Sequence, residues 1–226
     1  MKTLDSLLTL GPPQYCTNTL LISSLGLQDY QTTLQAMQYY TKNRQPTAPD
    51  QIWLLEHHPI YTSGPLSQKN DILATLPYPL ISTDRGGKIT FHAPGQLIGY
   101  CMFQLKNLQE SSNLVTQIER LLITLLSTYH ITAHANTQYR GVYVQQEKIA
   151  SIGLRVKKNF TYHGFALNVD MDLLPFKKIN PCGRSQKMTQ ITHYQKTTME
   201  EVFTLCIQHI KNLWRTTHKI VCNPST

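Results

Sequence analysis

Residues 142–169 read VYVQQEKIASIGLRVKKNFTYHGFALNV and contain three strand-like patterns in a row. Val142–Val144 and Ile149–Val156 alternate around the polar triplet at 145–147, which predicts a hairpin. Phe160–Val169 is rich in aromatic and branched side chains and predicts a further strand. This part of the chain is therefore expected to form sheet.

The amino-terminal part mixes other signals. Leu20–Arg44 is predicted to be a single helix, since Tyr30, Leu34 and Met37 recur at helical spacing. Ile52–Leu55 is an apolar run that predicts a strand. Frequent prolines then predict a loop-rich stretch up to about residue 80.

Two more helices are predicted further along the chain. Ser111 and Ser112 precede an amphipathic pattern and are expected to cap its first turn. Thr198 and Glu201 have the spacing of a capping box and open a second apolar pattern that extends to Leu213. Strands and helices mix without regular βαβ alternation, and no linker is marked by composition. We therefore predict an α+β fold in one domain spanning residues 1–226.

Composition narrows the class of protein. The chain has 226 residues, of which 41% are hydrophobic and 15% charged, which is typical of a soluble globular domain with a sizeable core. Met1–Cys16 lacks the apolar run of a signal peptide. No run approaches the roughly 18 apolar residues of a membrane span. We expect a cytoplasmic protein without a membrane span.

The chain contains five cysteines, at positions 16, 101, 182, 206 and 222. Their number is odd, and their wide spacing contains no Cys-x-x-Cys pair, so neither a disulfide framework nor a metal site is predicted. Cys206 falls within an apolar helical pattern and is expected in the core. Cys222 is expected to be more exposed.

The formal net charge is +8, with a pI near 9.2. Such a surface attracts acidic partners and accelerates their encounter. The basic residues are scattered and no aromatic residues alternate with them. An acidic protein partner is therefore favoured over nucleic acid.

The densest motif is the run RGGKITFHAPGQ at residues 85–96. Adjacent Gly86 and Gly87 allow a loop backbone to approach a ligand closely, although a purely structural turn explains them equally well. The spacing differs from that of a Walker phosphate loop. Residues 89–92 alternate as a strand leaving the loop would.

Two further runs combine small and apolar residues. KIASIGLR at residues 148–155 starts with Lys148 after the predicted turn, and HGFALNV occupies residues 163–169. Each run alone is unremarkable, and a surface position is the usual one for a lysine. Together the runs are consistent with a slot for an extended aliphatic group.

Cys182 lies between Pro181 and Gly183. Proline fixes the backbone φ and glycine removes side-chain bulk, which predicts a tight, accessible loop. A thiol on such a loop can meet a large substrate, although free cysteines are more often buried.

The chain resembles the lipoyl(octanoyl) transferase family over most of its length. The resemblance rests on EHHPIYTSG at residues 56–64, on residues 85–96, 148–156 and 163–168, and on INPCG at residues 179–183. It implies the α+β catalytic module of biotin and lipoate protein ligases, in which helices flank a mixed sheet. Two departures are Ala93, where the family has glycine, and the basic stretch at residues 184–187.

The resemblance also implies roles for individual residues. Cys182 matches the acyl-thioester cysteine, and Lys148 matches the lysine that activates it. The positions that match substrate-binding segments are Arg85, Gly86, Gly87, Lys88, Ile89, Thr90, Phe91, His92, Ser151, Ile152, Gly153, Gly164, Phe165 and Ala166.

The implied reaction moves an octanoyl group from octanoyl-acyl carrier protein to a lysine of lipoyl domains, without cofactor or metal. The implied acceptors are 2-oxoacid dehydrogenase E2 subunits and the glycine cleavage H protein. Two alternatives stay open: an ATP-dependent lipoate ligase on the same fold, and a non-catalytic protein that binds acyl chains or acyl carrier protein.

Overall fold

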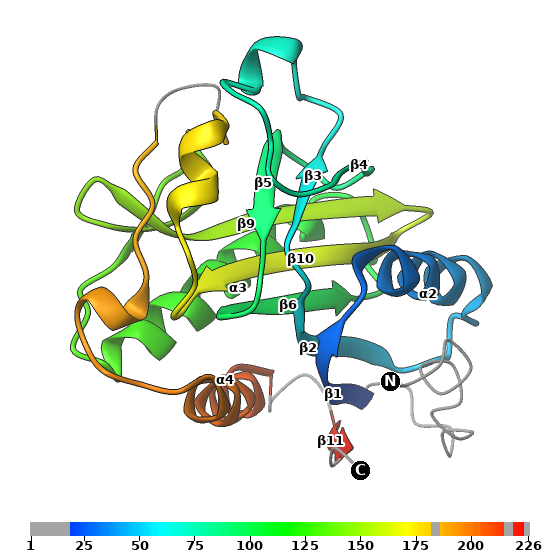
Figure 1. Ribbon diagram of the computed structural model, residues 1–226. Helices are drawn as coiled ribbons and strands as arrows, with labels where there is room; N and C mark the ends of the chain where they lie inside the picture. The colour runs from blue at the N-terminus through cyan, green and yellow to red at the C-terminus, as the bar shows by residue number, and fades with distance from the viewer. Residues whose placement is uncertain (1–18, 182–185, 215–218, 224–226) are drawn as a thin grey trace.

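An eight-stranded sheet crosses the molecule, and a smaller three-stranded sheet lies against it (Figure 1). The computed structural model describes residues 19–181, 186–214 and 219–223. Its elements are β1 (Thr19–Gln28), α2 (Tyr30–Asn43), β2 (Asp50–His57), β3 (Ile60–Ser63), η1 (Lys69–Asp71), β4 (Leu80–Ser82), β5 (Ile89–His92), β6 (Gln96–Met102), α3 (Glu110–Ser127), β7 (His134–Ala135), β8 (Gly141–Val144), β9 (Glu147–Lys157), β10 (Phe160–Asn168), η2 (Leu174–Lys178), η3 (Ile191–His193), α4 (Met199–Trp214) and β11 (Lys219–Asn223).

The strand order of the large sheet is β11-β1-β2-β6-β10-β9-β8-β7. β1 runs parallel to both β11 and β2, and the remaining neighbours are antiparallel. The small sheet has the order β4-β3-β5. The predicted α+β class with a mixed sheet flanked by helices is therefore confirmed.

Each face of the large sheet has its own apolar core. On one face, α3 and α4 pack against side chains such as Leu54, Phe165 and Leu167. On the other face, α2 packs against a cluster that includes Trp53 and Ala166. Alternate residues of one strand enter opposite cores because successive side chains of a strand point to opposite faces.

The small sheet has a third core beneath it. Tyr61 and Phe91 pack with their ring centroids 4.9 Å apart, and Phe176 of η2 meets Phe91 at 5.9 Å. These contacts fix β3 and β5 above the large sheet. The loop that precedes β5 is thereby held close to the edge of β9.

The expected single helix at Leu20–Arg44 is wrong in its first part. Residues 19–28 form β1, and α2 begins only at Tyr30. Asp29 separates the two elements, because its Oδ1 accepts a hydrogen bond from the Thr32 N–H at 2.8 Å and caps the helix. Pairing of β1 with strands on both sides overrides the local pattern.

Other predicted elements are confirmed, with corrections at their ends. β8 and β9 form the hairpin, and β10 follows as the next strand. α3 begins at Glu110, and the Ser111 hydroxyl donates to the Leu108 carbonyl at 2.6 Å, so the expected serine cap is wrong. α4 starts beside Thr198, whose hydroxyl accepts from the Glu201 N–H at 3.2 Å, which is one of the two bonds of a capping box; the Glu201 carboxylate instead accepts from the Thr197 hydroxyl at 2.9 Å.

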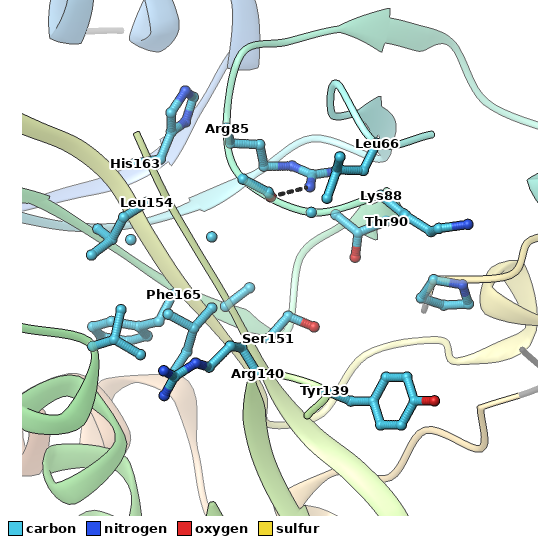
Figure 2. A pocket seen from close by; sticks show the side chains of 18 of the residues that line it. Leu66, Arg85, Lys88, Thr90, Tyr139, Arg140, Ser151, Leu154, His163 and Phe165 are labelled. Carbon is cyan, nitrogen blue, oxygen red and sulfur yellow. Dashed lines mark hydrogen bonds between the residues drawn. The ribbon is translucent and has the colours of Figure 1, made fainter. Parts of the chain in front are cut away.

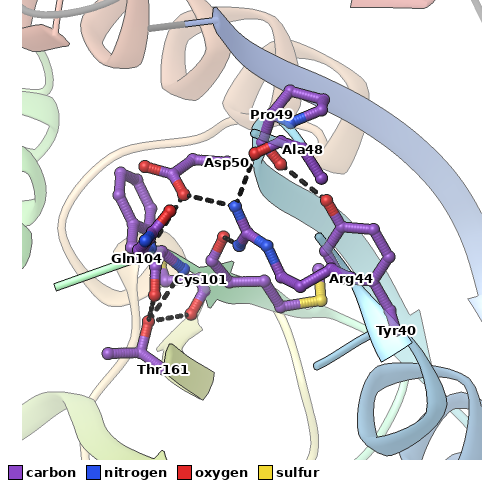
Figure 3. Close-up of polar contacts among 10 residues, drawn as sticks. Tyr40, Arg44, Ala48, Pro49, Asp50, Cys101, Gln104 and Thr161 are labelled. Atoms are coloured by element: carbon purple, nitrogen blue, oxygen red, sulfur yellow. Dashed lines mark hydrogen bonds and ion pairs between the residues drawn. The ribbon is translucent and has the colours of Figure 1, made fainter. Parts of the chain in front are cut away.

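A buried ion pair holds the end of α2 (Figure 3). The Arg44 guanidinium lies 2.9 Å from the Asp50 carboxylate and donates to the carbonyl oxygens of Ala48 and Met102 at 2.8 and 3.0 Å. It also lies 4.9 Å from the centroid of the Phe160 ring. The Arg44 side chain therefore ties α2, β2, β6 and β10 together.

Candidate functional site

A cavity of about 560 Å³ opens where the loop before β5 meets β9 and β10 (Figure 2). The loop contributes Arg85 and Lys88, β5 contributes Thr90, and β9 and β10 contribute Ser151 and Phe165 among others. Its lining comes from both faces of the large sheet, because the cavity also reaches side chains on the α3 side.

Close backbone contact explains two of the glycines. The Gly86 N–H donates to the Leu154 carbonyl at 3.1 Å. A Cβ added at Gly153 would lie 2.7 Å from the Gly86 carbonyl oxygen, and one at Gly86 would lie 3.0 Å from the Leu154 oxygen. Any side chain at either position would therefore push the loop away from β9.

The register of β9 against β10 places the predicted binding residues on opposite faces of the large sheet. Ser151 pairs with Ala166 and Gly153 pairs with Gly164, whereas Ile152 pairs with Phe165. Ala166 belongs to the α2 core and Phe165 to the α3 and α4 core. Since side chains alternate, Ile152 and Phe165 face away from the side on which Gly153 meets the Arg85–Lys88 loop.

Fourteen of the sixteen predicted site residues line this one cavity: Arg85, Gly86, Gly87, Lys88, Ile89, Thr90, His92, Lys148, Ser151, Ile152, Gly153, Gly164, Phe165 and Ala166. Phe91 does not line it, because its ring packs under the small sheet. Cys182 lies outside the described residues. Pro181, the residue before it, lines the cavity.

Arg85 is a buried cation held by neutral acceptors. Its guanidinium donates to the Thr62 carbonyl and hydroxyl oxygens at 2.7 and 2.9 Å and to the Gly86 carbonyl at 3.1 Å. Burial lowers the pKa of Arg85. Among the described side chains, no carboxylate lies within ion-pair distance of this guanidinium. The cavity therefore has a positive electrostatic character on this side.

His92 and its neighbour His57 are buried, neutral histidines. His92 Nδ1 lies 2.8 Å from Gln96 Oε1, and burial lowers its pKa to about 3. His57 Nε2 lies 2.6 Å from the Tyr100 hydroxyl, and burial lowers its pKa to about 4. These rings form hydrogen bonds at neutral pH without adding charge.

His163 is coupled to a carboxylate. Its Nε2 lies 3.0 Å from Asp84 Oδ1, and the Tyr162 hydroxyl donates to the other carboxylate oxygen. The hydrogen bond from His163 lowers the pKa of Asp84 to about 2, while burial lowers that of His163. The two shifts describe an ionised Asp84 that accepts a hydrogen bond from a neutral imidazole.

Lys148 is buried at the start of β9, with 4% of the residue exposed. Its backbone N–H donates to the Lys187 carbonyl at 2.8 Å, so the chain after residue 185 runs beside it. Its Nζ lies 5.4 Å from the centroid of the Tyr143 ring. A Cβ added at Gly141 would lie 2.4 Å from Lys148 Cε, so this glycine makes room for the lysine.

Two of the other thiols are inert core residues. Cys101 and Cys206 are fully buried, as predicted for Cys206. Burial raises the pKa of Cys206 to about 12 and raises that of Cys101 as well. Neither thiol can supply a thiolate at neutral pH.

Some lining residues have no local sequence signal. They come from elements distant in sequence and include Tyr30 of α2, Tyr100 of β6, Val115 of α3 and Arg140 before β8. Tyr30 and His92 stack with their centroids 5.9 Å apart. Tertiary packing brings these side chains to the cavity, and no motif in the sequence marks them.

The described residues contain neither a cluster of metal ligands nor a membrane-spanning helix. No group of three or more His, Cys, Asp or Glu side chains there could hold a metal ion. None of the helices in the described ranges combines the length and hydropathy of a membrane span.

Solved structures share this fold. A bi-partite lipoate protein ligase from Thermoplasma acidophilum superposes with a TM-score of 0.74 at 13% identity, covering 94% of this chain and 88% of that one. The biotin protein ligase from Aquifex aeolicus in complex with biotin and ATP gives 0.52 at 13% identity, covering 87% and 70%. The fold is thus that of lipoate and biotin protein ligase catalytic domains.

Sequence relatives define the family. The sequence model of the protein family described as the lipoyl protein ligase A/B catalytic domain matches residues 29–211. The octanoyltransferase of Vibrio cholerae serotype O1 is 42% identical over 198 residues, which cover 87% of this chain and 92% of that relative. The octanoyltransferase of Shewanella amazonensis is 46% identical over 166 residues, covering 73% and 77%. The chain belongs to the lipoyl(octanoyl) transferase family.

Proposed function

We propose that this transferase moves an octanoyl group from octanoyl-acyl carrier protein to a lysine of lipoyl domains through a thioester on Cys182. The observation that carries the proposal is the shared cavity, where Lys148, the Arg85–Lys88 loop and Pro181 meet. The proposed acceptors are the lipoyl domains of 2-oxoacid dehydrogenase E2 subunits and the glycine cleavage H protein.

The cavity offers suitable surroundings for both ends of an acyl thioester. Ile89, Ile98 and Ala166 provide apolar walls, and burying seven carbons at about 0.8 kcal/mol each contributes roughly 5–6 kcal/mol. Arg85 supplies a buried positive charge that favours the negative charge developing on the thioester oxygen during attack. The apolar walls and the guanidinium thus suit opposite ends of one substrate.

Activation of the thiol alone accelerates the reaction too little to be the whole role of Lys148. Lowering a thiol pKa from about 8.5 to about 7 raises the thiolate fraction roughly fifteenfold at neutral pH. A Brønsted slope of about 0.4–0.5 returns much of that gain through weaker nucleophilicity. The net acceleration is only a few-fold, so a second role is needed.

Lys148 changes role between the two half-reactions in this proposal. In the first, the Cys182 thiolate attacks the donor carbonyl, and the leaving carrier thiolate takes a proton from the Lys148 ammonium. In the second, the acceptor lysine enters as its neutral amine, and the Lys148 amine takes the one proton that this nitrogen loses as it attacks the acyl-thioester. Amide formation releases the Cys182 thiolate and restores the starting state. No ATP is consumed.

The test is an intact-mass measurement after mixing the protein with octanoyl-acyl carrier protein and no acceptor. We expect one added octanoyl group, which hydroxylamine or a lipoyl domain removes. Cys182→Ser should gain none, because a serine hydroxyl is barely ionised at neutral pH. Cys16→Ser and Cys222→Ser are the matched controls and should keep the adduct.

Two outcomes would refute the proposed thioester on Cys182: an adduct on another cysteine, or full transfer by Cys182→Ser. Modification of a lipoyl domain from free octanoate only when ATP is added would favour the ATP-dependent ligase. A tight complex with the carrier protein, with neither adduct nor transfer, would favour the non-catalytic binding protein.

A further inference from the structure

Asp71 lies where three segments of the chain meet. Its backbone carbonyl accepts a hydrogen bond from the Asn180 N–H at 2.8 Å. The Leu73 N–H donates to the Lys178 carbonyl at 2.9 Å, and residues 72 and 179 form an antiparallel bridge. The chain around η1 therefore holds the segment Lys178–Pro181, which ends at the cavity.

The Asp71 carboxylate points to the other side of this junction. Its oxygens lie 3.1 and 3.3 Å from Lys88 Nζ, and Oδ2 accepts from the Gln68 N–H at 2.7 Å. The side chain of Asp71 is 5% exposed and that of Lys88 is 24% exposed. Since Lys88 lines the cavity, the ion pair links the Arg85–Lys88 loop to the chain around η1.

We infer that Asp71 is a positioning residue for acyl transfer. Its carboxylate holds Lys88 and its backbone holds Asn180, so one residue fixes the loop on one side of the cavity relative to the segment that precedes Cys182 on the other. This inference rests on the proposed function, because it assumes that the residue after Pro181 is the nucleophile.

Such a junction controls how the reacting groups are aligned with each other. A misplacement of about 1 Å between reacting groups can cost about a hundredfold in rate. A largely buried ion pair that loses one partner leaves the other charge poorly solvated, so the remaining side chain moves toward water. Loss of the Asp71 charge should therefore release Lys88 and shift the loop, without touching the thiol itself.

The test compares Asp71→Asn with the wild type in single turnover. Asparagine keeps the size of the side chain and an acceptor for the Gln68 N–H but removes the charge. We expect acyl-enzyme formation at saturating octanoyl-acyl carrier protein to slow at least tenfold. Alkylation of Cys182 by iodoacetamide should keep its rate and its pH profile, since a small reagent needs no alignment.

Two further variants distinguish a positioning role from a general loss of stability. Asp50→Asn makes the same exchange in the Arg44–Asp50 pair, none of whose residues lines the cavity, and should lower the melting temperature with unchanged acylation. Lys88→Gln should slow acylation as Asp71→Asn does. The double variant should be no slower than either single one, because both remove one interaction.

Wild-type acylation rates in Asp71→Asn would overturn the inference, and so would full additivity with Lys88→Gln. A changed pH profile of alkylation would replace positioning by a direct electrostatic effect on the thiol, which also overturns it. Failure of the wild type to form any adduct would instead refute the proposed function.

Discussion

His92, which lines the cavity, and its neighbour His57 stay uncharged because burial disfavours their protonated form. His57 has its pKa lowered to about 4 and His92 to about 3, against about 6.5 for an exposed imidazole. Their ring nitrogens are engaged by neutral groups, among them the Gln28 carbonyl and the Tyr100 hydroxyl. Protonating either ring therefore opposes folding.

This predicts a loss of stability on mild acidification. The unfolded chain binds protons at these positions below pH 6.5, and the folded chain does not until about pH 4 or lower. The free energy of unfolding should fall by about 1.4 kcal/mol per pH unit for each histidine within that window. Urea unfolding between pH 7 and pH 5 measures the slope, ahead of the window in which Asp84 titrates.

His57→Gln provides the comparison, since glutamine can still form hydrogen bonds but cannot titrate. It should reduce the slope by up to about 1.4 kcal/mol per pH unit, whatever its effect on stability at pH 7. An unchanged slope in the variant would contradict the assignment of His57 as a buried neutral group.

Single residues differ in how far sequence alone predicts their place. Gly86 and Gly153 are predictable because a motif with small residues marks a close approach, and the structure gives that approach. Phe91 and Tyr100 are not, because only the register of β5 and β6 decides which face each side chain enters. The roles of Cys182 and Lys148 stay predictions.

At the scale of elements, the loop before β5 depends on β9 for its position. Gly153→Ala would place a methyl group 2.7 Å from the Gly86 carbonyl oxygen, which is backbone and cannot rotate away. We expect kcat/KM for octanoyl transfer to fall at least tenfold, with a stability loss of about 1–3 kcal/mol. Steady-state kinetics and thermal melting measure the two effects.

Gly26→Ala is the control for backbone strain away from the cavity. Gly26 has φ +66°, and an added Cβ there would meet nothing within 4 Å. Alanine should lower stability because it rarely adopts this conformation, while kcat/KM of the folded enzyme stays unchanged. Normal kcat/KM in Gly153→Ala would show that the loop does not need this contact.

Elements with a strong local pattern were predictable and those set by pairing were not. The β8–β9 hairpin and α4 follow from alternation and a capping box in their own sequence. β1 resembles the start of a helix in sequence, and only its pairing with β2 and β11 makes it a strand. Residues far apart in the chain supply that information.

Over the whole molecule, the net charge of +8 is the main long-range feature. We expect kcat/KM for octanoyl-acyl carrier protein to fall several-fold from low to physiological ionic strength, because salt screens the attraction of an acidic partner. The value of kcat should change little. Stopped-flow or steady-state rates over a salt series measure this effect.

Octanoyl-pantetheine serves as the matched donor, because it carries no net charge and no protein. Its kcat/KM should be nearly independent of salt. Equal salt dependence for both donors, or none for either, would show that the positive charge plays no part in the recognition of the carrier protein. The predicted cytoplasmic location and the single domain over residues 1–226 also stay predictions.

The parallel pairing of β1 with β11 affects how the chain folds while it is being synthesised. Residues 19–23 align with residues 219–223, so about 200 residues separate the two strands. At a synthesis rate of about 5–20 residues per second, β1 waits roughly 10–40 s for that partner. During this interval its outer edge presents unpaired backbone groups, which readily recruit other chains. Nascent chains on one messenger are thus exposed to cross-pairing until residues 219–223 have been made, and a ribosome stalled before that point would prolong the exposure.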